Sequence, residues 1–461
     1  MDETSAASEA CPPVSAGTRV GAGILVAALA IGVLFDQLGI VWPIGLGLAL
    51  AMLLLALATP LVARLTGVAV GRGIWLIAPI IVAAGFLAVR DSGALIALDL
   101  GVIAACGALL GHRLRGGSIL RDGFADYALA MILSCVYASV GVLFVALSDV
   151  TWRELAGLRW SRIVAPIVRG VAIAVPLVLV FGLLFVSADP AFERLVRDIL
   201  RIDLAALLRD VVLSFMLAWL AAGVLRQALL AKVHPSLNLA CPPALRLGGA
   251  EVAIVLGLLD LLFLSFVVVQ LQWFFGGPAL VTESPTLTYS EYARRGFFEL
   301  VTVAALVLPL ALLGDWMLRR DGGPGLWLYR GLTIALLVLV GVVMASALNR
   351  MLLYHAAYGM TELRFYPAVF MGWLALVFVW FGATVLRGAR DRFAGGALVG
   401  GLLVVLGLNL LNPDALIVRA NAERSDAARR FDYRYAKTMS ADAVPALVEA
   451  LPKLSDEARG E

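Results

Sequence analysis

The sequence predicts an all-α membrane protein, a polytopic transmembrane helix bundle of about eleven or twelve spans followed by a short polar helical tail. Of its 461 residues, 62% are hydrophobic and 15% are charged, and the mean hydropathy is +0.95. A soluble domain cannot bury that much apolar surface. The apolar runs continue for about 18 to 25 residues, whereas the strands of a membrane barrel would alternate polar and apolar residues over about ten.

Residues 1–17 form a polar, acidic amino-terminal tail. They contain Asp2, Glu3 and Glu9 and no Lys or Arg, whereas a secretory signal has a basic stretch before its apolar core. We therefore expect the first apolar run to be retained as a membrane span.

Twelve apolar runs follow within residues 18–412, the predicted transmembrane domain. We expect membrane helices at 18–35, 40–63, 74–89, 93–112, 124–147, 169–187, 210–231, 250–275, 297–317, 331–350, 366–386 and 395–412. The first two runs and the next two have short connections, DQLG and RDSG, which predict helical hairpins. In the last run, Gly396 and Gly400 have the spacing that lets two helices approach closely.

The distribution of Lys and Arg predicts the orientation of the second half. From Arg153 to Arg392, one alternating set of loops carries thirteen basic residues and the opposite set carries eight. The richer set should face the cytoplasm, which places the tail after Asn412 outside, in the periplasm of a Gram-negative cell. Three arginines that precede the fifth run would then be external if 124–147 crosses fully, so that crossing and the amino-terminal orientation stay open.

The segment Ser187–Arg209 predicts an amphipathic helix at the outer interface. Phe192, Leu195 and Ile199 recur three to four residues apart with charges between them. A connecting helix packed across neighbouring spans fits the same pattern.

Residues 413–461 form a polar tail in which we expect two helices. The first should run from Pro413 to about Arg430, and the second should begin near Ser440, a suitable N-cap. An apolar face on the second helix needs a partner, either the outer surface of the membrane domain or another envelope protein. That face comprises Val444, Leu447, Val448 and Leu451.

The usual catalytic and metal-binding signatures do not occur in the sequence. It has no phosphate-binding loop, no H-E-x-x-H and no G-x-S-x-G, and its four Cys and three His lie far apart. We expect no metal and no cofactor. The net charge of +3 forms no basic stripe, which excludes nucleic acid as an expected partner.

Ionisable residues within the apolar runs are the best pointers to function, because charge inside a bilayer is costly. Asp260 is the deepest, and Asp99 and Glu299 follow. Arg295 and Glu299 are four residues apart, so an intrahelical ion pair is natural. The candidate polar cluster, at the predicted outer ends of the eighth to eleventh runs, comprises Asp260, Tyr292, Arg294, Arg295, Glu299, Arg350, Tyr354, His355 and Arg364, with Asp99 as a secondary candidate.

This cluster has two interpretations. The arginines could form an electropositive outer pocket for an anionic solute or lipid head group, closed by the tyrosines. They could equally anchor helix ends at the interface and neutralise the acidic residues. The sequence leaves both open.

The string TYSEYARRGFFEL at Thr288–Leu300, followed by an apolar helix, resembles the signature of a bacterial membrane-protein family known as a domain of unknown function, numbered 4153 or 4173. Three further strings agree: SADPAF at Ser187, NPDALIVRANAER at Asn412 and SADAVPALVEAL at Ser440. The resemblance covers Arg169 to Leu451, and the amino-terminal part shows no match. It implies a bacterial inner-membrane protein and a role for Tyr292 to Glu299, but supplies no activity.

Three classes of function follow as expectations. The first is a non-enzymatic transporter or binder of an anionic solute or lipid head group at the outer face, with a carboxylate as the expected proton-coupling device. The second is an envelope regulator or scaffold that acts through the tail. The third is a membrane enzyme with a lipid-linked substrate, for which no spacing of residues speaks. The lipid bilayer is the expected partner in each.

Overall fold

The computed structural model describes residues 15–41, 44–114, 123–152, 204–231, 242–276, 297–319, 324–424 and 431–453, with single positions between 154 and 192. Within these ranges, the only pairing of extended backbone is one bridge between Leu247 and Leu318. Ten of the described helices are long and apolar enough to cross a membrane. The protein is therefore an all-α, multi-pass membrane protein.

Eleven of the twelve predicted apolar runs coincide with described helices. The run 74–89 forms a shorter apolar helix over Arg72–Leu87 instead of a span-length one. The run 124–147 lies in one apolar helical stretch, Phe124–Asp149, of spanning length. The run 169–187 is described at positions 170, 174, 177–178, 180–182 and 184–187, all of them helical. Of the predicted interfacial helix over Ser187–Arg209, residues 204–209 belong to the long helix Leu204–Leu229 instead, and 190–203 lie outside the described residues except for position 192.

The described residues group into two compact units. Unit 1 takes in residues 1–89, 100–118 and 128–235, and unit 2 takes in residues 90–99, 119–127 and 236–461. The helix α4 (Gly93–Arg113) begins in unit 2 and continues in unit 1.

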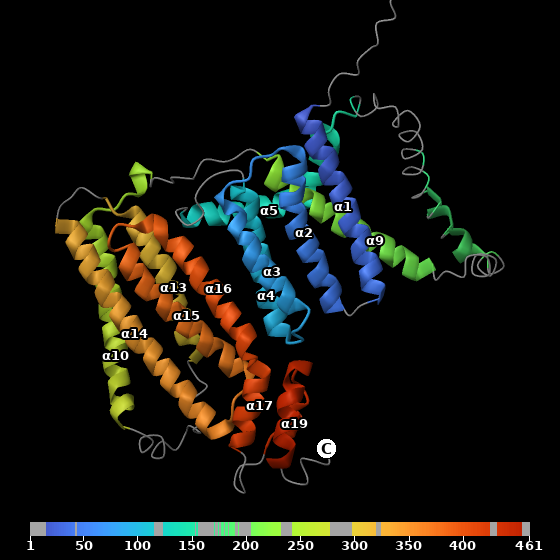
Figure 1. Cartoon of the computed structure of the whole chain (residues 1–461). Helices are drawn as coiled ribbons and strands as arrows, with labels where there is room; N and C mark the ends of the chain where they lie inside the picture. Colours follow the sequence, from blue (N-terminus) through green and yellow to red (C-terminus); the bar gives the residue numbers. More distant parts are fainter. Residues whose placement is uncertain are drawn as a thin grey trace, which may run out of the picture. The chain divides into compact units, whose positions relative to one another are not determined.

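Unit 1 is built around α1 (Ala16–Val41), which packs against α2 (Ile44–Thr66) and α9 (Leu204–Leu229) (Figure 1). The helix α3 (Ile77–Leu87) follows the 3-10 turn η1 (Arg72–Leu76) and packs on α2. Close approach depends on glycine where α5 (Phe124–Phe144) meets α9, because a Cβ on Gly141 would lie 2.8 Å from the Cα of Gly223. Small residues let membrane helices pack backbone to backbone in this way.

An ion pair fixes the end of the α5 stretch to α9 inside unit 1. Arg226 Nε lies 2.6 Å from Asp149 Oδ2, and its guanidinium lies 5.0 Å from the ring centroid of Phe144. The charge near the end of a span is thus neutralised within the protein, which lowers the cost of placing it there.

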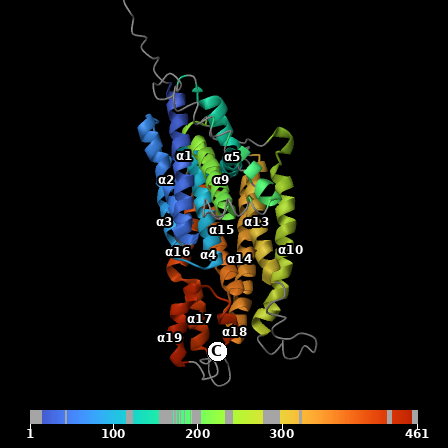
Figure 2. The same cartoon turned by 90° about the vertical axis from the view of Figure 1, so that its right-hand side faces the viewer.

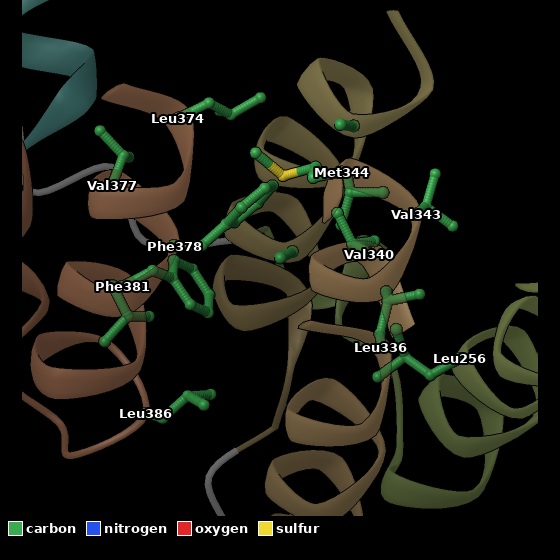
Figure 3. Packing of buried hydrophobic residues seen from close by; sticks show 14 of the residues in the cluster. Leu256, Leu336, Val340, Val343, Met344, Leu374, Val377, Phe378, Phe381 and Leu386 are labelled. Carbon is green, nitrogen blue, oxygen red and sulfur yellow. The ribbon is translucent and has the colours of Figure 1, made fainter. Parts of the chain in front are cut away.

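Unit 2 is centred on α14 (Pro324–Tyr358). It packs against α10 (Gly249–Gly276), α13 (Phe297–Met317) and α15 (Glu362–Thr384), and α15 packs in turn against α16 (Phe393–Leu411). Figure 3 shows this core, in which Leu336, Val340 and Met344 of α14 meet side chains of α10 and α15, including Leu256, Phe378 and Phe381. Between helices in lipid, such packing acts through van der Waals contact, since lipid tails are as apolar as the side chains.

The outer faces of unit 2 carry large apolar side chains. Leu258, Leu261 and Leu262 of α10 are each 63% exposed. Contiguous apolar surface of this kind is unusual in a soluble monomer and is typical of contact with lipid.

The pair Gly396 and Gly400 does support close packing, as its spacing predicts, but only Gly396 is essential to it. The indole of Trp380 on α15 occupies the place where a Cβ on Gly396 would lie, and Trp380 Nε1 donates to the carbonyl of Phe393 at 3.2 Å. A Cβ on Gly400 would make only an ordinary contact, 4.0 Å from Trp373 Nε1. Gly396 therefore leaves the space that the Trp380 side chain of the neighbouring helix fills.

The tail begins with a sharp change of direction at Asn412. This residue has φ 52°, in the left-handed region that commonly ends helices, and its Oδ1 accepts from the N–H of Ala415 at 3.2 Å, which caps α17 (Pro413–Glu423). Pro413 at the first helical position suits a helix start. The predicted helix to Arg430 thus ends earlier, at Glu423, and residues 425–430 lie outside the described range.

The rest of the tail comprises α18 (Tyr433–Ala436), the 3-10 turn η6 (Ala441–Ala443), α19 (Val444–Ala450) and η7 (Leu451–Lys453). Ser440 caps η6 as predicted, since its Oγ accepts from the N–H of Asp442 at 3.3 Å. Figure 2 shows α17 and α19 side by side.

The expected apolar face of α19 is not the face that packs. Ala443 and Ala446, with Leu447 beside them, contact Ala415 and Val418 of α17, whereas Val444 and Val448 remain 51% and 59% exposed. The larger side chains of Val444, Val448 and Leu451 remain exposed, so the expectation that they bind another protein stays a prediction.

Candidate functional site

Four segments of unit 2 meet in a buried polar cluster: the start of α4, the end of α16, the start of α17 and the turn η6. We call the residues they contribute the junction cluster. Its members are Arg90, Asp91, Ser92, Asp99, Asn409, Asn412, Asp414, Ser440 and Asp442. The backbone changes direction at each of these segments, which brings helix ends and their polar groups together.

Asp99 and Asn409 form the deepest part of the junction cluster. Asp99 is 1% exposed and Asn409 is fully buried, and Asn409 Nδ2 donates to Asp99 Oδ1 at 2.9 Å and to the carbonyl of Val405 at 3.2 Å. The other two oxygens, Asp99 Oδ2 and Asn409 Oδ1, have no hydrogen-bond partner among the described residues. Buried polar atoms rarely stay unpaired, so these two require an explanation.

Arg90 links this pair to the tail. Its guanidinium donates to the backbone carbonyl of Asn409, and its Nη1 lies 3.9 Å from Asp442 Oδ1. The Arg90 charge also acts on Asp99. The positive charge of Arg90 therefore interacts with a carboxylate in a membrane helix, Asp99, and with a carboxylate in the tail, Asp442.

Asp91 and Asp442 cap each other's helices. Asp442 Oδ2 accepts from the N–H groups of Asp91 and Ser92 at 3.0 and 3.1 Å, at the amino end of α4. In return, Asp91 Oδ2 accepts from the N–H of Ala441 at 3.0 Å, at the amino end of η6. The first N–H groups of a helix have no partner within it, and a carboxylate there also interacts favourably with the helix dipole.

A second acidic pair lies at the start of α15 and α17. Asp414 is fully buried; its Oδ2 accepts from the hydroxyl of Ser440 and its Oδ1 has no partner among the described residues. The carboxyl group of Glu362 lies within hydrogen-bonding range of Asp414. Two carboxyl groups this close repel each other when both are ionised.

Two tyrosines border the acidic pair. Tyr366 lies near Asp414 and Glu362, and its hydroxyl interacts with that of Ser92. The hydroxyl of Tyr435 accepts from the N–H of Glu362 at 2.9 Å. Burial raises the pKa of Tyr435 above its usual value, so this hydroxyl stays protonated at neutral pH.

The site as described holds the guanidinium of Arg90, has that of Arg364 near Tyr435, and contains more carboxyl groups than cations. Within the described ranges, no three His, Cys, Asp or Glu side chains are placed to hold a metal ion. Carboxyl groups therefore outnumber the described cations at this site. The carboxyl groups concerned are Asp91, Asp99, Glu362, Asp414 and Asp442.

The predicted polar cluster is distributed differently from the expectation. Tyr292, Arg294 and Arg295 lie outside the described residues, so their grouping stays a prediction. Glu299 is exposed in the first turn of α13. Asp260 is half-buried in α10, and neither of its oxygens has a partner in the described part of the chain.

Tyr354, His355 and Arg364 do come together, at the carboxyl end of α14. The Arg364 guanidinium lies 3.9 Å from the ring centroid of Tyr354 and donates to the carbonyl of Gly359 at 2.5 Å, while His355 lies near Arg364. Cations commonly bind the last carbonyls of a helix in this way. These contacts favour the anchoring interpretation for Arg364; Arg350, partly buried one turn before Tyr354, stays a candidate.

The comparison with known proteins agrees with the architecture. A family model described as a domain of unknown function (DUF4153) matches residues 76–450. The chain belongs to this family. The DUF4153 match begins well before Arg169, so the expectation that the amino-terminal part has no match was wrong. It includes every residue of the junction cluster, from Arg90 to Asp442. No curated protein and no solved structure matches the chain.

Most of the junction cluster was missed from the sequence, which pointed only to Asp99. Asn409 sits near the end of an apolar run and has no charge, and Asp414 and Asp442 look like ordinary tail residues. The available signal was the polar Asn409 within an apolar helix, since such residues tend to hydrogen-bond across helices in membranes.

Proposed function

We propose that the protein is a membrane transport protein that binds and moves a proton at Asp99. The observation that carries this proposal is the Asp99–Asn409 pair, whose two residues are joined by one hydrogen bond and each keep one oxygen without a partner among the described residues. A carboxylate inside a membrane protein is costly and is typically part of an ion or proton pathway.

The chemistry of the pair favours a proton as the missing group. A carboxylic acid and a primary amide are complementary, because each offers one donor and one acceptor. With Asp99 ionised, only the amide donates. A proton on Asp99 Oδ2 supplies a donor for Asn409 Oδ1 and pairs both unpaired oxygens at once.

The groups that face Asp99 are one cation and several uncharged polar groups. Arg90 is the cation that acts on Asp99, and it also contacts the carboxylate of Asp442. Asn409 and the carbonyl of Val405 face Asp99 from α16 and carry no charge. Asp99 is therefore surrounded by a cation on one side and by uncharged polar groups on the other.

The same proposal includes a transported solute and a membrane across which a proton gradient is maintained. A proton site of this kind couples to transport across a membrane that holds a proton gradient, such as a bacterial inner membrane. An anionic solute at the outer face, bound by Arg294 and Arg295, would complete a proton-coupled transporter. The contacts of Asp442 with α4 favour a tail that acts within this protein over one that serves as a free scaffold.

The proton site can be tested without knowing the solute. Infrared difference spectra between acidic and alkaline pH report the carbonyl stretch of a protonated carboxylic acid. Wild-type protein in lipid should show such a band, and Asp99→Asn should lose the component of it that comes from a carboxyl group shielded from water. Asp391→Asn, which changes an exposed carboxylate in the turn before α16, should keep it. An unchanged spectrum in folded Asp99→Asn would overturn the proton site.

Movement of the proton needs a second measurement. Purified full-length protein in liposomes that contain a pH-sensitive dye, driven by a potassium diffusion potential, should take up protons faster than protein-free liposomes. Asp99→Asn should reduce the rate about tenfold or more, the usual scale for a lost proton-transfer group. Equal rates for wild-type and protein-free liposomes would refute transport.

A further inference from the structure

The amino end of α4 carries more hydrogen-bond donors than its present acceptor uses. Asp442 takes the N–H groups of Asp91 and Ser92 and faces the guanidinium of Arg90. Arg90 Nε has no partner among the described residues. The hydroxyls of Ser92 and Tyr366 interact with each other, which leaves one of their two protons without an acceptor in the described part of the chain. Ser92 is itself only 1% exposed.

We propose that the amino end of α4 is a binding site for a small oxyanion, a carboxylate or a phosphate group, and that Asp442 of the tail occupies it as an internal ligand. A free anion of this class would then compete with the tail. Helix amino ends bind such groups through their N–H donors and dipole, and a guanidinium strengthens the binding.

The contact with Arg90 is the weakest of the contacts that Asp442 makes with the site. Its ion pair with Arg90, at 3.9 Å, is near the outer limit for such pairs. A phosphate group presents up to four oxygens, against two in Asp442, and would use the hydroxyl of Ser92 and the free edge of Arg90 as well.

Nearby carboxyl groups limit the charge of the ligand. Asp414 and Glu362 lie beside Tyr366, and Asp91 adjoins the site and binds Ala441. The site therefore suits a singly charged anion better than a doubly charged one. This proposal does not depend on proton transfer at Asp99, because it uses different donor atoms.

Hydrogen exchange of the wild-type chain is the first test. The full-length protein in nanodiscs of zwitterionic lipid is compared in inorganic phosphate and in chloride at equal ionic strength. Phosphate should speed exchange at Ala441 and along Val444–Ala450, because the tail leaves, while Asp91 and Ser92 keep their protection through the new ligand. Exchange that is the same in both salts would overturn the proposal.

A variant provides the second test. Asp442→Asn weakens the internal ligand, and since an internally occupied site binds in proportion to its vacant fraction, the dissociation constant for phosphate should fall about tenfold or more. The gain should be absent in Asp391→Asn and lost in the double variant Arg90→Gln, Asp442→Asn. A phosphate affinity of folded Asp442→Asn equal to that of wild type would refute competition by the tail.

The source of the anion is distinguished by the lipid. Nanodiscs of phosphatidylglycerol, without inorganic phosphate, should release the tail if the ligand is a lipid phosphate. They should leave the tail docked if the site admits only a soluble anion. Release of the tail in neither lipid nor phosphate would overturn the oxyanion site.

Discussion

Asn409 donates its side-chain amide to Asp99 at 2.9 Å, across 310 positions of sequence, and so joins α16 to α4. The bond pairs one oxygen of a buried carboxylate and leaves the other without a described donor. It is the relationship from which the proposed proton site follows, and it also determines how the pair contributes to stability.

Replacing Asn409 by leucine should destabilise the protein by about 1–3 kcal/mol, because the buried Asp99 loses a donor. The measurement is thermal unfolding in detergent. Asn349→Leu makes the same change at an exposed position of α14 and should have little effect. Adding Asp99→Asn to Asn409→Leu should recover part of the loss, since the unpaired carboxylate is then gone. Equal melting temperatures for Asn409→Leu and Asn349→Leu would contradict this account.

The mutual caps of Asp91 and Asp442 should behave as one unit. Asp91→Ala and Asp442→Ala should each speed hydrogen exchange over Ala441–Ala450. The double variant should be little worse than either, because the two caps hold the same pair of segments together and loss of either one releases the tail. Glu449→Ala removes an exposed ion pair with Arg419 and should leave that exchange nearly unchanged. Fully additive effects of Asp91→Ala and Asp442→Ala would argue against a shared contact.

Alanine at Gly396 should be destabilising, whereas alanine at Gly400 should not. The new Cβ at Gly396 would collide with the indole of Trp380, and overpacking of this kind costs about 1–3 kcal/mol. The Cβ at Gly400 would lie 4.0 Å from Trp373 Nε1. The melting temperatures of the two variants test this prediction. Trp380→Leu, which replaces the indole by a smaller side chain, should restore part of the stability that Gly396→Ala loses.

Tyr435 should make the tail sensitive to alkali. Burial raises the pKa of Tyr435 from 10.0, so its folded form holds the proton more tightly than its unfolded form. Its contribution to stability is therefore fully present below about pH 10 and is lost as the pH rises toward the folded pKa. Thermal stability measured from neutral pH to about pH 11 should show the decline.

Two variants separate this effect from general alkaline unfolding. Tyr435→Phe should flatten the decline and also lower stability at neutral pH, because the N–H of Glu362 loses its acceptor. Tyr433→Phe removes a hydroxyl from the same short helix and should preserve the decline. A decline of equal steepness in Tyr435→Phe would assign the alkaline effect to another group.

The sequence predicted part of the candidate site for a clear reason. Asp99 could be found because a carboxylate inside an apolar run is unusual whatever surrounds it. Its partners could not be found in this way. Asn409 is uncharged, and Asp442 belongs to a polar segment in which acids are common.

The sequence by itself determined the class of the protein, most of its helices and its family. Runs of apolar residues and the capping power of Ser440 are local properties, so they are visible without the fold. Only the tertiary structure decided that Asp99 meets Asn409, that Asp442 caps α4 and that α19 packs through its alanines and leaves Val444 and Val448 exposed. Those pairings depend on which helix ends come together and how closely two helices approach, and neither is encoded in the periodicity of a single segment.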